Sequence, residues 1–341
     1  MKYNFDEPVD RQGTNCVKYD INKDVFGRED ILPMWVADMD FLTPPFIIDA
    51  LKLRLDHEIL GYTVRRKEYF DSIAKWSKHR YGWDISKEWI LFSPGIVPAV
   101  NICTLAYTEP GDKIIVQPPV YFPFFGAVKD HNRKILFNRL IEEEGFYRFD
   151  FDDLRKKART GAKMLILSNP HNPVGRAWRK EELRELADIC LKHNILIISD
   201  EIHSDLVLPG FQHIPTASLS DDIAAITLTC LAPSKTFNLA GLSTSSMIIS
   251  NKVLREKFQQ KIDSLHIGGG NIFGTEASVA AYQEGEEWLE QLLSYLQENI
   301  NYLVNRLNGS NMPIKALAPE ATYMVWLDCR QMGMKGEELN K

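Results

Sequence analysis

Residues 164–173 read Met-Leu-Ile-Leu-Ser-Asn-Pro-His-Asn-Pro, an apolar run that changes abruptly into a polar turn. Four apolar residues followed by turn-forming residues predict a short buried strand. Residues 180–193 carry apolar side chains at helical spacing, and another apolar run, 195–198, follows them. A strand, a helix and a second strand in this order indicate a right-handed crossover between parallel strands. The sequence therefore predicts an α/β fold.

Two more apolar runs, 113–116 and 224–228, extend this pattern on both sides and are also expected to be buried strands. The carboxyl ends of parallel strands meet at one edge of a sheet, and ligands of such sheets bind there. The residues with chemical potential follow the predicted strands: Tyr121, Asn172, and the pair Asp200 and His203. We therefore expect one site at the carboxyl edge of the sheet.

The overall composition is that of an ordinary globular protein. The chain has 341 residues, of which 45% are hydrophobic, and its net charge of −6 argues against nucleic acid as the main partner. Its five cysteines are dispersed without metal-ligand spacing, so we expect a reducing cytoplasm, no disulfide framework and no metal site. We expect no signal peptide, because residues 1–7 contain no apolar run, and no membrane span, because no run approaches roughly 18 apolar residues.

Lys235 is the first candidate for chemistry, within the segment Pro233-Ser234-Lys235-Thr236-Phe237-Asn238. A lysine lodged in a cleft loses hydration of its ammonium group, so its pKa falls and the free amine can form a Schiff base. An exposed loop lysine is the alternative, and the segment taken alone fits that alternative better.

Three further candidates each have a structural alternative. Asp200 ends a buried strand, where its carboxylate needs a cation such as a protonated pyridine nitrogen, although a helix cap or an arginine partner would also satisfy it. Gly95 precedes an apolar helical run that begins with Ile96 and Val97, and free N–H groups at a helix start can bind phosphate. Tyr121 follows two prolines and could stack on a flat ring or pack in the core.

The order of these features along the chain is far more specific than any one of them. Asn172-Pro173-Val174-Gly175, Asp200-Glu201 and Ser234-Lys235 resemble the signature elements of the fold-type-I pyridoxal-phosphate (PLP) enzymes, the aspartate-aminotransferase-like superfamily. Residues 10–15, 34–41 (Met-Trp-Val-Ala-Asp-Met-Asp-Phe), 200–203 and 232–238 look like the cystathionine β-lyase, or C–S lyase, branch. The resemblance covers nearly the whole chain.

The resemblance implies PLP as the cofactor and gives roles around its ring. Lys235 would bind PLP as a Schiff base and later move the Cα proton of the substrate. Asp200 would pair with the pyridine nitrogen, Asn172 would hydrogen-bond the ring O3′, and Tyr121 would stack on the ring. His203 stands where transaminases usually place a tyrosine. The resemblance also places cis bonds at Pro118–Pro119 and Asn172–Pro173.

The resemblance further implies how the phosphate is held and how the protein assembles. Gly95, Ile96, Val97 and Ser234 would hold the phosphate, and Tyr62 would reach the phosphate of the neighbouring subunit, so a homodimer with shared active sites is expected. Ser243 stands where aspartate aminotransferase has a phosphate-binding arginine. The arginine that binds the substrate carboxylate in the family would lie beyond Lys341.

The fold implied is a large PLP-binding domain around a mostly parallel, seven-stranded sheet, with a small α/β domain that is incomplete at its C-terminal end. We expect residues 1–45 to contribute to the small domain, 46–285 to form the large domain, and 286–341 to form a long helix and the start of the small domain. The reaction implied is α,β-elimination of a cysteine thioether to a thiol, pyruvate and ammonia. An aminotransferase and a PLP-binding regulatory protein with little turnover are the alternatives.

Overall fold

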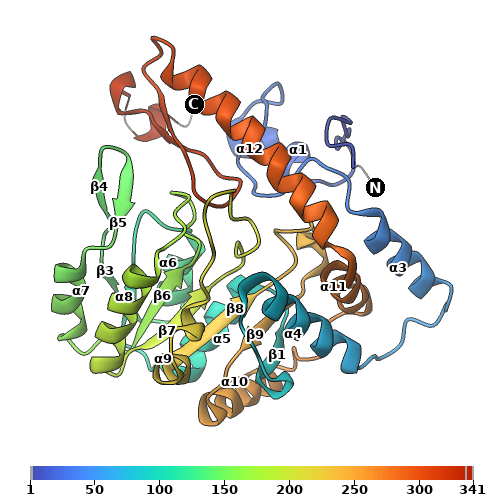
Figure 1. The fold of residues 1–341 in the computed structure, drawn as a ribbon, viewed down its shortest axis with the longest axis vertical. Helices are drawn as coiled ribbons and strands as arrows, with labels where there is room; N and C mark the ends of the chain where they lie inside the picture. Colours follow the sequence, from blue (N-terminus) through green and yellow to red (C-terminus); the bar gives the residue numbers. More distant parts are fainter. Residues whose placement is uncertain (1–2, 335, 340–341) are drawn as a thin grey trace.

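The computed structural model describes residues 3–334 and 336–339. Within them, the main sheet has seven strands in the order β1-β9-β8-β7-β6-β2-β3 (Figure 1). Only β9 runs antiparallel to its neighbours, so the prediction of a mostly parallel α/β sheet is confirmed. The strands span β1 (Ile90–Ser93), β2 (Lys113–Val116), β3 (Lys134–Phe137), β6 (Met164–Ser168), β7 (Leu196–Asp200), β8 (Thr227–Leu231) and β9 (Ser245–Ile248).

Helices cover both faces of the sheet because alternate residues of each strand point to opposite faces. In β2, Ile114 and Val116 pack on one side, whereas Ile115 between them packs on the other. The first side is covered by α5 (Ile96–Tyr107), α6 (Pro123–Lys129) and α10 (Lys252–Ser264). The second side is covered by α7 (Phe151–Ala158), α8 (Lys180–Lys192) and α9 (Asp221–Ile226).

A further hydrophobic core lies at the β1 end of the sheet. It joins α3 (Pro45–Leu55), α4 (Lys67–Tyr81), α11 (Ile272–Glu284) and the long α12 (Glu286–Asn308). Leu289, Leu292, Leu293 and Leu296 of the predicted long helix pack into this core together with Trp76 of α4. The division of the chain near residues 45 and 285 stays a prediction, since α12 shares a core with helices on the other side of that division.

Both the N-terminal segment and the chain that follows α12 contact this helix, the latter where the amide of Asn308 donates to the carbonyl of Ala316 at 2.9 Å. The N-terminal segment, blue in Figure 1, runs beside α12, where Phe5 packs against Trp288 and Tyr3 N–H donates to Gln291 Oε1 at 2.8 Å. The remaining elements are short: α1 (Val17–Asp20), α2 (Asn22–Phe26), β4 (Ile141–Glu143), β5 (Phe146–Arg148), β10 (Lys315–Leu317) and β11 (Trp326–Asp328). The last two pair as a separate antiparallel ribbon.

One predicted strand begins in the wrong place. Ala224–Ile226 belongs to α9, and β8 starts only at Thr227. The reason is local capping, because the Ser220 hydroxyl accepts from the N–H of Ile223 at 3.4 Å and two aspartates occupy the first turn. The apolar run 224–228 therefore spans the end of a helix and the start of a strand.

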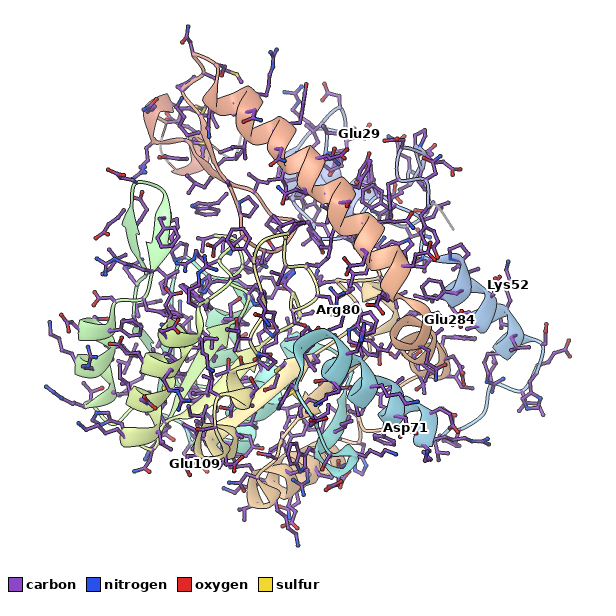
Figure 2. All side chains as sticks on the ribbon, viewed as in Figure 1. Glu29, Lys52, Asp71, Arg80, Glu109 and Glu284 are labelled. Atoms are coloured by element: carbon purple, nitrogen blue, oxygen red, sulfur yellow. The ribbon has the colours of Figure 1, made fainter. Side chains whose placement is uncertain are left out.

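The surface is charged, and Glu29, Lys52 and Glu109 lie exposed at the periphery of the molecule (Figure 2). Across residues 3–334 and 336–339, no helix combines the length and the apolar composition that a membrane span requires. Over the same residues, no three or more His, Cys, Asp and Glu side chains gather closely enough to hold a metal ion.

Candidate active site

The predicted site residues follow the carboxyl ends of five strands. Gly95 follows β1, Tyr121 follows β2, Asn172 follows β6, Asp200 ends β7, and Lys235 follows β8. All five strands run in the same direction, so their carboxyl ends share one edge of the sheet. The sheet thus brings together residues that lie far apart in the sequence.

Lys235 is half-buried, and its amine is held by the N-terminal part of the chain. Its Nζ donates to the carbonyl oxygen of Ala37 at 2.5 Å. Burial lowers the pKa of Lys235, while the negative charges of Asp38 and Asp200 oppose this effect. The alternative of an exposed loop lysine is therefore wrong.

Asp200 is a carboxylate buried at the end of a strand, 5% exposed. Its Oδ1 accepts from the N–H of Ile202 at 3.1 Å, and burial raises its pKa to about 7. Glu201, the next residue, faces away and binds the ring of His213 at 2.9 Å. Among the described residues, no lysine or arginine forms an ion pair with Asp200, so its carboxylate is placed to receive a positive group from a ligand.

His203 lies close to Lys235 and is 3% exposed. Burial first, and the nearby ammonium of Lys235 second, lower its pKa to about 3. Within the described part of the chain its Nδ1 has no hydrogen-bond partner. His203 is therefore neutral at physiological pH and can act only as an uncharged donor or acceptor.

Tyr121 and Asn172 are linked through their backbones, since the N–H of Tyr121 donates to the carbonyl of Asn172 at 3.1 Å. The N–H of Asn172 in turn donates to the hydroxyl of Ser168 at the end of β6, also at 3.1 Å. Tyr121 lies near Asp200, whose charge adds to burial in raising the pKa of the tyrosine. The peptide bonds Pro118–Pro119 and Asn172–Pro173 are cis, as predicted, and Asn169–Pro170 is cis as well, which the sequence did not indicate.

The start of α5 presents backbone N–H groups without a side-chain cap. Gly95 precedes it with φ +151°, a conformation that side-chain-bearing residues rarely adopt, and Ile96 and Val97 form the first turn. Ser234 is half-buried next to Lys235. A helix start of this kind suits a phosphate group.

Tyr62 is not brought to the other residues within one chain. It is fully exposed, in the segment between α3 and α4. The expected carboxylate-binding arginine beyond Lys341 lies outside the described residues.

Tyr323 is a site residue that sequence reasoning missed. Its hydroxyl donates to the carbonyl of Ala37 at 2.9 Å, and its ring meets the edge of His203 with centroids 5.9 Å apart. Ala37 was recognised only as part of a family motif, with no role. That motif was the only signal for Ala37, and nothing local in the sequence places Tyr323 near Lys235.

These residues fit PLP. The buried carboxylate of Asp200 matches the pyridine nitrogen, and the half-buried amine of Lys235 matches the aldehyde. The unpartnered ring nitrogen of His203 matches the polar ring substituents, and the uncapped start of α5 matches the phosphate.

Comparisons with known proteins agree with this geometry. Cystathionine β-lyase PatB of Bacillus subtilis is 46% identical over 339 residues, which cover 99% of this chain and 88% of the relative. A PLP-bound protein from Clostridium difficile 630, which carries an aminotransferase name, has a TM-score of 0.97 and 44% identity over 99% of this chain and 88% of its own. The PLP-bound C–S lyase from Staphylococcus hominis has a TM-score of 0.92 and 37% identity over 98% and 86%. The family model for class I and II aminotransferases matches residues 29–339, and the chain belongs to that family.

Proposed function

We propose that this protein is a PLP-dependent carbon–sulfur β-lyase that converts L-cystathionine or a related cysteine thioether into a thiol, pyruvate and ammonia. One observation carries the proposal: Lys235 and Asp200 share one sheet edge in a chain that is 46% identical to a cystathionine β-lyase. When bound, PLP supplies the electron sink that stabilises negative charge at the substrate Cα.

The chain's own residues would hold this cofactor by complementary contacts. Lys235 offers an amine to the aldehyde, and Asp200 offers a carboxylate to the pyridinium nitrogen. Asn172 and Tyr121 flank the ring, and His203 contributes a neutral imidazole. The phosphate would lie at Gly95, Ile96 and Val97, with Ser234 beside it.

Elimination then needs one proton acceptor and one leaving group. Nζ of Lys235 takes the proton from the substrate Cα, the Cβ–S bond breaks, and its electron pair leaves with the thiolate, which takes up a proton. Water hydrolyses the released three-carbon enamine to pyruvate and ammonia. Proton transfer by a positioned group contributes about 10²–10⁴-fold to rate. Asp200 would face the ring nitrogen of the bound cofactor and His203 is buried, so Lys235 would be the proton acceptor.

An aminotransferase is the second candidate, because the family model and the name of the Clostridium difficile protein point to that activity. The two reactions differ in where the proton goes and in whether sulfur leaves. The test is to incubate the protein with PLP and L-cystathionine without a keto acid. Continuous pyruvate release supports the lyase, whereas turnover that depends on an added keto acid supports the aminotransferase.

The proposal includes a cytoplasmic homodimer with active sites shared between subunits. The segment between α3 and α4 supports this assembly, because Ile59, Leu60, Tyr62 and Val64 are all exposed in the single chain. An apolar stretch of this kind marks an interaction surface. Tyr62 would then complete the phosphate site of the other subunit.

A further inference from the structure

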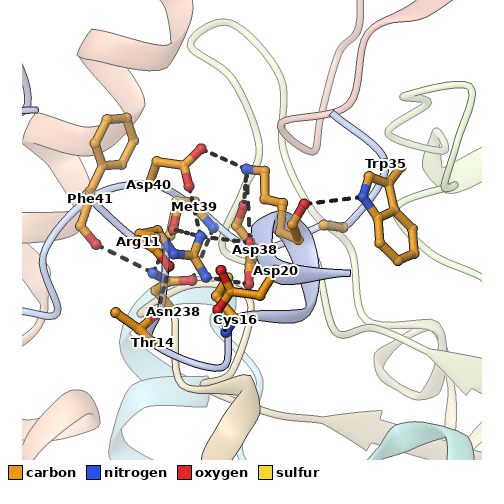
Figure 3. A network of polar contacts seen from close by, with 12 residues as sticks. Arg11, Thr14, Cys16, Asp20, Trp35, Asp38, Met39, Asp40, Phe41 and Asn238 are labelled. Atoms are coloured by element: carbon orange, nitrogen blue, oxygen red, sulfur yellow. Dashed lines mark hydrogen bonds and ion pairs between the residues drawn. The ribbon is translucent and has the colours of Figure 1, made fainter. Parts of the chain in front are cut away.

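Residues 37–41, hereafter the overlying segment, are held against the loop that contains Lys235. The Ala37 carbonyl accepts from Lys235 Nζ at 2.5 Å, and Asn238, three residues after Lys235, binds both the N–H and the carbonyl of Met39, at 3.0 and 2.9 Å. Asn238 has φ +60°, and its side-chain amide faces Met39 (Figure 3). Hydrogen bonds thus join the overlying segment to the Lys235 loop at two places, Ala37 with Lys235 and Met39 with Asn238.

Two cations also hold the overlying segment (Figure 3). Arg11 binds both carboxylate oxygens of Asp38, at 3.0 and 2.8 Å, and also Asp40 at 2.7 Å. Lys18, 6% exposed, binds Asp40 at 2.6 Å and the Asp38 carbonyl at 3.2 Å. A bidentate arginine contact fixes orientation as well as distance. The position of the Ala37 carbonyl is therefore set by residues that do not themselves touch Lys235.

The Ala37 carbonyl has a second donor. The hydroxyl of Tyr323 reaches the same oxygen at 2.9 Å. A carbonyl oxygen has two lone pairs and can accept both donors, but each weakens the pull of the oxygen on the other. Tyr323 therefore competes with the ammonium of Lys235 for this acceptor.

The groups that face Lys235 come from four parts of the fold. Asp38 lies in the overlying segment, Asp200 ends β7 with His203 after it, Tyr323 precedes β11, and Tyr121 lies on the side of Asp200. His203 and the two tyrosines are uncharged at physiological pH, because burial lowers the pKa of the histidine and raises the pKa of each tyrosine. The negative charges that act on the lysine are therefore those of Asp38 and, above its raised pKa of about 7, of Asp200.

We propose that the overlying segment positions the Lys235 amine through the Ala37 carbonyl, that Tyr323 and Asp38 are positioning residues which adjust this hold in opposite directions, and that together they set the pH at which Lys235 becomes a free nucleophile. The inference rests on the proposed function, in which Lys235 is the residue that binds PLP.

The direction in which each variant changes the pKa of Lys235 depends on which charge state of the lysine the lost contact favours. The carbonyl binds the ammonium more strongly than the neutral amine, so Tyr323→Phe should strengthen that bond and raise the pKa of Lys235. Asp38→Asn removes a negative charge and should lower the pKa of Lys235. Asp40→Asn is the matched control, because it weakens contacts to the same Arg11 and Lys18, whereas the negative charges that act on Lys235 are those of Asp38 and Asp200.

The experiment measures how fast Lys235 captures PLP. The cofactor-free full chain is mixed with PLP at a series of pH values and quenched with borohydride, and labelled Lys235 is quantified by mass spectrometry. We expect the midpoint of the pH profile to rise by about half a unit in Tyr323→Phe and to fall by about half a unit in Asp38→Asn. The midpoint of Asp40→Asn should stay that of the unmodified protein.

A failure of the proposed function and a failure of the positioning role give different results in this experiment. If Lys235 of the unmodified protein is not labelled at any pH, the proposed function fails. If it is labelled but Tyr323→Phe keeps the original midpoint, or Asp38→Asn and Asp40→Asn shift it equally, the positioning role is overturned. Tyr323→Phe leaves no buried acceptor unpaired, since Ala37 retains Lys235, so this variant is expected to fold.

Discussion

The half-buried amine of Lys235 is the residue on which the proposed chemistry depends. Lys235→Ala should abolish both covalent PLP labelling and pyruvate release, because the other candidate residues offer no amine at this edge of the sheet. The matched control is Lys252→Ala, which removes an exposed lysine at the start of α10. Labelling and pyruvate release are compared for both variants. Normal turnover by Lys235→Ala would rule out the assignment.

Asp200 should matter through its charge. Asp200→Asn keeps the size and one oxygen of the side chain but removes the partner of the pyridinium nitrogen. Losing one member of a buried ion pair costs about 3–5 kcal/mol, so kcat/KM should fall by at least about 100-fold. Steady-state kinetics of pyruvate release with saturating PLP measure this effect. An unchanged rate would mean that Asp200 is structural.

Asp200 also gives the cofactor-free protein a pH-dependent stability. Burial raises its pKa from 3.8 to about 7, so the folded chain keeps a proton that the unfolded chain releases in this window. The free energy of unfolding should therefore decrease as pH rises from about 4 to about 7, by up to about 4 kcal/mol, and then level off. Urea unfolding across this range compares the protein with Asp200→Asn. Because His171 and His203 titrate in both, the difference isolates this carboxyl, and parallel profiles would contradict the expectation.

At the scale of elements, the turn after β6 is locked to the chain that precedes Tyr323. The N–H groups of Glu320 and Ala321 both donate to the carbonyl of Gly175, at 2.7 and 3.0 Å. A Cβ on Gly175 would lie 2.5 Å from the Cβ of Pro319. This close approach ties the turn that carries Asn172 to the segment that carries Tyr323.

Gly175→Ala tests this contact. Gly175 has φ +73°, so alanine costs about 1–2 kcal/mol in backbone strain, and overpacking against Pro319 adds about 1–3 kcal/mol. Gly161→Ala is the matched control, since Gly161 has φ +81° but nothing within 4 Å of the added Cβ. Thermal unfolding should show a clearly larger loss for Gly175→Ala, and equal losses would show that the contact with Pro319 gives way freely.

The elements that could be predicted are those with a strong local signal. The run 113–116 coincides with β2, and the helical pattern of 180–193 coincides with α8 to within one residue. The start of β8 was wrong because a serine cap and two aspartates extended a helix into the apolar run. Tyr323 and Ala37 could not be predicted as neighbours of Lys235, because their contact depends on tertiary packing between segments far apart in the chain.

At the scale of the whole molecule, one chain assembles most of the proposed site but leaves one predicted member outside it. The overlying segment, the sheet edge and the segment around Tyr323 converge on Lys235. Tyr62 instead lies fully exposed beside exposed Ile59 and Leu60. A second copy that covers this stretch would bury apolar surface and bring Tyr62 to a site in the same step.

Subunit complementation tests this arrangement directly. Lys235→Ala destroys the site of its own subunit, whereas Tyr62→Ala should damage the site of the partner. When the two inactive variants are unfolded, mixed equally and refolded, about half of the dimers are mixed, and each contains one site with both residues intact. Pyruvate release should therefore recover to about a quarter of the unmodified rate. The control mixture of Lys235→Ala with Asp200→Asn should recover nothing, because both lesions lie in sites built by their own subunits. If the Tyr62→Ala mixture also stays inactive although size-exclusion chromatography shows dimers, Tyr62 does not complete the neighbouring site.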